Sequence, residues 1–283
     1  MPEPESVLSV SCGQSDFSGS RSRSGNPRGW EKAVNRKQPK AAQNSGLNRR
    51  CLVGNLEPKE VESQSTIVAH QVSSPIELRA HNPAPEWLAT TPIRFSADWR
   101  GQNPDPDLET EVRLLWSQSV LYLRFTCRYR ELFLFDDSDP NGRRDQLWER
   151  DVVEAFLQPP DSLAKSDIPL STSRYRAFYK EFEVAPNGLW LDLDISPSGL
   201  TDLKSGLTRS VHIEETKKTW ASELAIPMTT LTARFDPASP WRANFFCVEG
   251  RTEPRKYMAW QPTQTGQPDF HVPEAFGTLR FEP

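Results

Sequence analysis

Residues 110–127 read TEVRLLWSQSVLYLRFTC, and this stretch decides the fold class. Apolar and polar side chains alternate on both sides of a short connection, residues 117–119. A period of two residues is typical of a strand with one buried face. A connection of this length suits a hairpin. The stretch therefore predicts two antiparallel strands, residues 111–116 and 120–127.

The same alternation continues to the end of the chain, between turns rich in Pro, Gly, Asp and Asn. It predicts further strands at residues 152–157, 178–184, 190–195, 210–214, 220–226, 243–248, 256–260 and 278–281. Residues 228–232 are the one predicted helical turn. Without the spacing of strand–helix–strand units, the pattern favours an all-β fold, an antiparallel β-sandwich of about nine or more strands over residues 65–283. Its predicted core consists of Leu114, Leu123, Phe125, Val153, Leu157, Phe182, Leu224, Ile226 and Phe245.

Composition excludes several other classes of protein. The 283 residues include 25 prolines, too many for a helical bundle. No apolar run is long enough for a transmembrane helix, and a net charge of −4 disfavours indiscriminate nucleic-acid binding. The four cysteines, at positions 12, 51, 127 and 247, form no CxxC pair, which excludes zinc-finger spacing, and a disulfide framework is not expected in so long a chain.

Residues 1–64 differ from the rest of the chain. They hold two aromatic residues and 10 Lys or Arg against 7 Asp or Glu. A segment so poor in large apolar groups cannot offset its ordering entropy, so we expect a disordered tail. Its small net positive charge disfavours the alternative of a basic arm that contacts nucleic acid. Glu3 and Glu5 occupy the region where a secretory signal is positively charged, so no signal peptide is predicted.

Sequence motifs for catalysis are absent. The chain contains no HExxH, GxSxG or phosphate-binding glycine loop. Asp151 and Glu154 are three residues apart on a predicted strand, and therefore face opposite sides of the sheet. Glu181 and Glu183 share a face, but adjacent acids on an exposed strand are typical of a solvated surface. The sequence therefore favours a protein that is not an enzyme.

One acidic loop, residues 136–142, fits the first half of a calcium-binding EF-hand loop through Asp137, Asp139 and Asn141. Trp148 stands where the bidentate glutamate belongs, and no helix is predicted beside the loop. Asp, Asn and Gly are also the residues of ordinary tight turns. A structural Ca²⁺ ion and a simple turn are both compatible with this pattern.

Three aromatic residues occur in polar surroundings. Trp148 lies in a polar loop, Trp260 precedes Gln261 and Pro262, and Phe270 lies between Asp269 and His271. Exposed rings beside carboxylates and amides suit sugars, whose C–H faces stack on rings while their hydroxyls form hydrogen bonds. We expect Trp116, Trp190 and Trp220, in contrast, to be core residues, and the lone His271 to be a hydrogen-bonded structural group.

Six segments, taken in order, resemble the family 9 carbohydrate-binding modules, particularly the stand-alone family-9-like proteins. These segments are residues 110–125, 151–157, 179–188, 220–227, 241–250 and 270–277. The likeness spans about residues 85–283. It implies a β-sandwich that commonly holds structural calcium, occurs with xylanases and other glycoside hydrolases, and captures a sugar between two aromatic rings.

The resemblance also implies roles for particular residues. Trp148 matches one ring of the sugar clamp, and Glu154 matches the acid that bonds sugar hydroxyls. Phe270 stands where the family has its second tryptophan. Three departures concern the ligand: Phe270 replaces the expected tryptophan, Glu183 stands where sugar-binding members can carry an arginine, and the opening signature is reduced to Pro85-Glu86-Trp87.

The resulting hypothesis is non-catalytic carbohydrate binding, with Trp148, Glu154, Phe270 and Trp260 as ligand-binding residues. The expected ligands are plant-type glycans similar to xylan or cellulose, bound during carbohydrate catabolism alongside glycoside hydrolases, with no nucleic-acid or membrane partner. The alternatives are a hydrolase of O-glycosyl bonds and a sandwich used for protein contacts. The resemblance implies work outside the cytoplasm, secreted or periplasmic, in contrast to the absence of a predicted signal.

Overall fold

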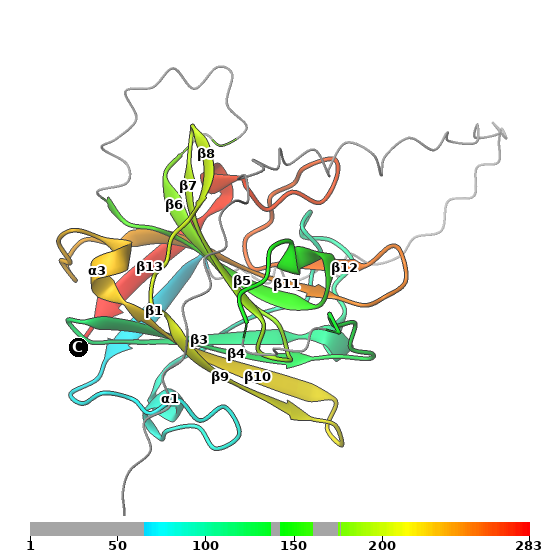
Figure 1. Ribbon diagram of the computed structural model, residues 1–283, viewed down its shortest axis with the longest axis horizontal. Coiled ribbons are helices and arrows are strands. Elements are labelled where there is room, and N and C mark those ends of the chain that lie inside the picture. The colour runs from blue at the N-terminus through cyan, green and yellow to red at the C-terminus, as the bar shows by residue number, and fades with distance from the viewer. Residues whose placement is uncertain (1–64, 137–141, 161–174, 176) are drawn as a thin grey trace, which may run out of the picture. The chain divides into compact units, whose positions relative to one another are not determined.

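The computed structural model describes residues 65–136, 142–160, 175 and 177–283 (Figure 1). Every described residue lies in one compact unit, residues 60–283. The predicted tail, residues 1–64, lies outside the described residues. None of the helices in the described ranges is long and apolar enough to cross a membrane.

The described part of the chain forms 13 strands. They are β1 (Thr66–Gln71), β2 (Ile93–Phe95), β3 (Thr110–Trp116), β4 (Val120–Arg128), β5 (Val152–Gln158), β6 (Tyr179–Val184), β7 (Trp190–Ser196), β8 (Gly199–Asp202), β9 (Thr208–Glu214), β10 (Thr219–Pro227), β11 (Trp241–Glu249), β12 (Lys256–Ala259) and β13 (Gly277–Glu282). The short helices are α1 (Glu86–Ala89) and α3 (Met228–Leu231), and 3₁₀ turns occur at Pro106–Leu108, Leu147–Glu149 and Pro273–Ala275.

The strand and fold-class predictions are confirmed. Every strand predicted from the alternating pattern is present, and α3 is the predicted helical turn. The sequence pattern did not predict β1, β2 or β8. Strands β2 and β8 span three and four residues, too few for a period of two to be distinguished from chance.

One curled sheet contains all the strands, in the order β8-β7-β6-β5-β11-β13-β1-β3-β4-β10-β9, with β12 on β11 and β2 on β3. The pairing is antiparallel except at β1, which runs parallel to both β13 and β3. The predicted antiparallel sandwich therefore describes most of the pairing, with β1 as the exception. β1 connects the β5–β11 half of the sheet to the β3–β4 half (Figure 1).

The interior core lies between these two halves. Phe125 on β4 meets Phe245 on β11 with ring centroids 6.0 Å apart, so the halves face each other. All nine core residues predicted from sequence belong to this one buried cluster. Trp116 and Trp220 are buried in it as well, and Trp190 packs against it half-buried. The interior core is therefore that of a sandwich built from a single curled sheet.

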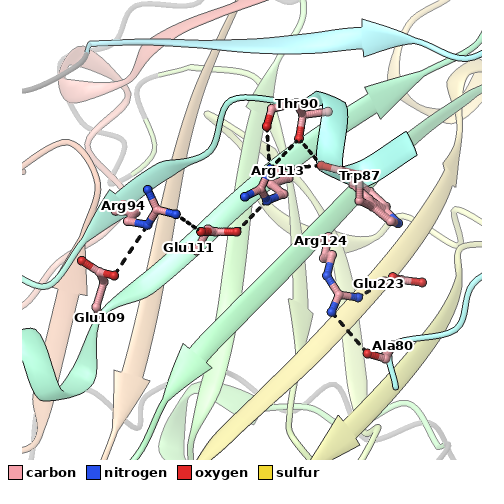
Figure 2. A network of polar contacts seen from close by, with 9 residues as sticks. All are labelled: Ala80, Trp87, Thr90, Arg94, Glu109, Glu111, Arg113, Arg124 and Glu223. Carbon is pink, nitrogen blue, oxygen red and sulfur yellow. Dashed lines mark hydrogen bonds and ion pairs between the residues drawn. The ribbon is translucent and has the colours of Figure 1, made fainter. Parts of the chain in front are cut away.

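The outer face of β3, β4 and β10 is covered by the segment between β1 and β2 (Figure 2). Arg113 donates to the carbonyl oxygens of Trp87, at 3.0 Å, and of Thr90. Arg124 forms an ion pair with the buried Glu223 and donates to the carbonyl oxygen of Ala80 at 3.2 Å. These hydrogen bonds hold the covering segment against the sheet, so residues 80–90 cover the outer face of β3, β4 and β10.

The outer face of β5, β6, β7 and β11 carries a second buried cluster, which we call the outer cluster. It comprises Leu147, Val152, Phe156, Tyr179, Ala185, Leu189, Leu191, Leu193, Ile195, Phe246, Val248, Ala259, Phe270 and Phe276. Both faces of β5 are consequently buried along its whole length. This outer face contains most of the site residues predicted from sequence.

Candidate functional site

Strand pairing places acidic residues side by side on the outer face. Glu154 on β5 lies opposite Glu183 on β6 and Phe246 on β11. Glu181 lies two residues along β6, opposite Phe156. Because residues separated by two point to the same face of a sheet, all three glutamates share the face that carries the outer cluster.

These glutamates are buried, and several of their carboxyl oxygens lack a hydrogen-bond partner among the described residues. Each side chain belongs to a residue that is at most 3% exposed. Glu154 Oε1, Glu181 Oε2 and both carboxyl oxygens of Glu183 have no hydrogen-bond partner among the described residues. The interpretation of Glu181 and Glu183 as a solvated surface is therefore wrong. Loop segments cover this face of the sheet, which alternation within one strand does not reveal.

Burial shifts the proton affinity of these groups. It raises the pKa of Glu181 to about 7. Burial also raises the pKa of Glu154 and of Glu183 well above the usual range, and the neighbouring carboxylates raise both further. At neutral pH, much of this group is therefore protonated. A protonated carboxyl donates as well as accepts hydrogen bonds.

An aromatic stack borders the glutamates. Phe270 lies nearly parallel to Phe246, at an interplanar angle of 11° with centroids 4.1 Å apart. Tyr257 approaches Phe270 edge-on at 6.4 Å. Phe270 is 9% exposed, so the expectation of an exposed ring is wrong. The position nevertheless places this ring next to Phe246, the direct neighbour of Glu154.

Trp148 packs half-buried against the outer cluster, from the 3₁₀ turn that precedes β5. The turn is anchored by Arg255, which donates to the Trp148 carbonyl oxygen at 3.2 Å and to Asp151 Oδ1 at 3.2 Å. Asp151 also accepts the backbone N–H groups of Phe133 and Gly250. Burial nonetheless raises the pKa of Asp151 to about 6. Asp151 is thus a structural anchor.

Trp260 does not share this face. It is 6% exposed and belongs to the interior core, where its ring lies 5.6 Å from Phe245. An added Cβ at Gly277 would lie 2.5 Å from the Trp260 ring, so this glycine makes room for it. The expectation of an exposed ring is wrong for Trp260 too, and the site proposed below does not include it.

His271 has the structural role expected from the sequence. Its Nδ1 lies 2.7 Å from the Tyr179 hydroxyl, and its ring packs on Phe156 at 5.2 Å. The hydrogen bond and the packing connect the segment that carries Phe270 to β5 and β6.

The predicted calcium ligands Asp137, Asp139 and Asn141 lie outside the described residues. In the ranges that the structure does describe, no group of three or more His, Cys, Asp or Glu residues is placed to hold a metal ion.

A known protein family matches the part of the chain that contains Phe246 on β11 and the segment of Phe270. Residues 203–281 match the model of carbohydrate-binding family 9. The likeness to family 9 is thereby confirmed for this part of the chain. The matched range includes β11 and the Phe270 segment, whereas Trp148 and the three glutamates precede it.

A relative from Arthroderma benhamiae is described as an extracellular protein. It is 26% identical over 215 residues, which cover 71% of this chain and 92% of the relative. A crystal structure from Bacteroides uniformis, described as carbohydrate-binding, has a TM-score of 0.54 and 16% identity, and covers 77% of this chain and 99% of its own. This likeness shows the fold. A family 9 module of Caldicellulosiruptor kristjanssonii, solved with cellotriose, has a TM-score of 0.49 and 14% identity over 77% of this chain and 93% of its own.

Proposed function

We propose that this protein binds carbohydrate without cleaving it, at the outer face of β5, β6 and β11. The observation that carries the proposal is the position of three buried glutamates beside the Phe246–Phe270 stack. The family 9 match over residues 203–281 supports it, because that range supplies the stack.

The chemistry of the face suits a sugar. Unpartnered carboxyl oxygens accept hydroxyl hydrogens, and protonated carboxyls donate to hydroxyl oxygens. The half-buried Trp148 presents a ring to the same cluster and stacks on a pyranose face, with Phe270 as the second aromatic wall. We propose ligands similar to xylan or cellulose, captured alongside glycoside hydrolases.

Calorimetry with xylo- and cello-oligosaccharides tests this proposal. Trp148→Ala removes a stacking contact of about 1–3 kcal/mol, by analogy with base stacking on aromatic rings. Binding then weakens by about 5- to 150-fold. Leu88→Ala, which truncates an exposed side chain outside the site, leaves binding unchanged. No binding by the wild type, or equal binding by Trp148→Ala, overturns the proposal.

A hydrolase is the second candidate, because register places Glu154 directly beside Glu183 on one face. Paired carboxyls are what glycoside cleavage requires. Release of reducing sugar from xylan and cellulose separates the two functions. A binding module releases none, and release that is lost in Glu154→Gln supports the hydrolase instead.

A further inference from the structure

Two cysteines that are distant in sequence meet in the interior core. Cys127 lies at the end of β4 and Cys247 on β11, and each is at most 2% exposed. Both belong to the cluster between the two halves of the sheet. The other two cysteines, Cys12 and Cys51, lie outside the described residues.

Strand geometry brings the two thiols together. β4 is antiparallel to β3, and β11 is antiparallel to β13. Since β3 and β13 both run parallel to β1, β4 and β11 run in the same direction. Phe125 and Phe245 meet across the core with centroids 6.0 Å apart. The next inward position on each strand is two residues further along, and on both strands it is a cysteine. Cys127 and Cys247 accordingly face each other across the core, and the Cys247 thiol contributes to raising the pKa of Cys127.

Apart from Thr110, which lies opposite Cys127 on β3, the strand neighbours of this pair are apolar. Trp220 on β10 lies beside Cys127, while Val153 on β5 and Met258 on β12 flank Cys247. Burial raises the pKa of the Cys127 thiol, so it forms little thiolate once the core has closed. The oxidation state of the pair is therefore set while the sandwich folds, when oxidants still reach it.

We propose that Cys127 and Cys247 form a disulfide when the protein folds in oxidising surroundings, and that this bond links the two halves of the curled sheet. The oxidant is a small disulfide such as oxidised glutathione. One cysteine thiolate attacks it, forms a mixed disulfide and releases one glutathione. The second thiolate attacks the mixed disulfide and releases the other glutathione, so two cysteines are oxidised and one glutathione disulfide is reduced to two thiols.

A disulfide between facing strands is known in other β-sandwiches and is expected to stabilise this one. Other β-sandwiches carry a disulfide between facing strands, packed against a buried tryptophan. Here the closed loop extends from β4 to β11. A long loop that is cross-linked loses much of its freedom in the unfolded state, so the oxidised protein is the more stable form.

The test uses the full chain, refolded from guanidinium either with oxidised glutathione or with dithiothreitol. Free thiols are alkylated in denaturant and the peptides are mapped by mass spectrometry. We expect a Cys127–Cys247 linked peptide after oxidative refolding only, and a higher melting temperature for the oxidised form. The double variant Cys12→Ser/Cys51→Ser keeps the linked peptide, because neither position contributes to the bond.

Cys247→Val abolishes the linked peptide, and its melting temperature becomes independent of the oxidant. If this variant does not fold, Cys127→Ala provides the same comparison. Alkylation of both Cys127 and Cys247 after oxidative refolding overturns the proposal. So does linkage of either one to Cys12 or Cys51.

Discussion

Glu154, Glu181 and Glu183 give the folded protein a greater affinity for protons than the unfolded chain has. Burial raises the pKa of Glu181 to about 7, from the ordinary value of a glutamate. Between these two values the folded state binds more protons than the unfolded state. Stability therefore falls as pH rises through this range, because proton binding favours the fold. Asp151, with a pKa raised to about 6, contributes in the same direction.

We predict that the free energy of unfolding is lower at pH 8 than at pH 5. Glu181→Gln removes one titrating group and keeps its shape, which reduces this pH dependence by about 3 kcal/mol. Urea unfolding at both pH values measures the effect, and Glu282→Gln on the exposed side of β13 is the matched control. A pH dependence that is the same in Glu181→Gln and wild type contradicts the prediction.

Leu123 is the central contact of the β3–β4–β10 layer. It is fully buried, with Leu114 and Leu224 as its register neighbours. We predict that Leu123→Ala lowers the free energy of unfolding by about 2–5 kcal/mol, because it leaves a cavity. Leu88→Ala, at a residue that is 79% exposed, changes it little and serves as the control. Chemical denaturation measures both, and equal stability of the two variants would show that Leu123 is not in the core.

Among the elements, β1 has a special position because it is the connection between β13 and β3 in the strand order. Its backbone pairs on both sides, and Ile67 and Ala69 are buried in the interior core. Removal of β1 leaves the facing edges of β13 and β3 without backbone hydrogen bonds. Buried backbone groups without hydrogen bonds lower the free energy of unfolding.

We predict that a chain beginning at residue 73 does not fold, whereas a chain beginning at residue 65 keeps the melting temperature of the full chain. The second expectation rests on composition, since residues 1–64 hold too few large apolar groups to form a core. Circular dichroism melts of the two truncated chains measure both. Cooperative melting of the shorter chain at the wild-type temperature would show that β1 is dispensable.

At the scale of the whole molecule, the two outer faces of the sheet differ in their polar contacts. The β3–β4–β10 face is closed by residues 80–90 through Arg113 and Arg124 (Figure 2). The opposite outer face carries the buried glutamates and the Phe246–Phe270 stack. The charged groups Arg113, Arg124 and Glu223 of the first face are thus paired internally, while the other face retains unpartnered carboxyl oxygens.

Calcium is a further prediction for the whole molecule. If residues 137–141 hold a structural Ca²⁺ through Asp137, Asp139 and Asn141, chelation removes a ligand that binds only the folded state. We expect EDTA to lower the melting temperature, and added Ca²⁺, but not Zn²⁺, to restore it. Asp139→Asn weakens the response to Ca²⁺. A melting curve that is unchanged by EDTA argues against the ion.

Sequence alone predicts ten of the 13 strands, the fold class and the residues of the interior core. The alternation of apolar and polar residues along β3, β4, β5 and β10 shows which face of each strand is apolar. This alternation involves only neighbouring residues, so it can be recognised in the sequence. Phe245 and Leu123 could therefore be assigned to one core without knowledge of strand order. The family likeness, based on short segments in order, also needed no coordinates.

What covers each face of the sheet depends on contacts between segments that are distant in the sequence. Alternation shows that Glu181 and Glu183 point away from Phe182, but it does not show that loops bury them, because those loops come from distant parts of the chain. For the same reason, the sequence did not show that Trp260 is buried in the interior core, or that Cys127 faces Cys247 there. The parallel pairing of β1 depends on β3 and on β13, a strand far away in the sequence, so tertiary contact determines it.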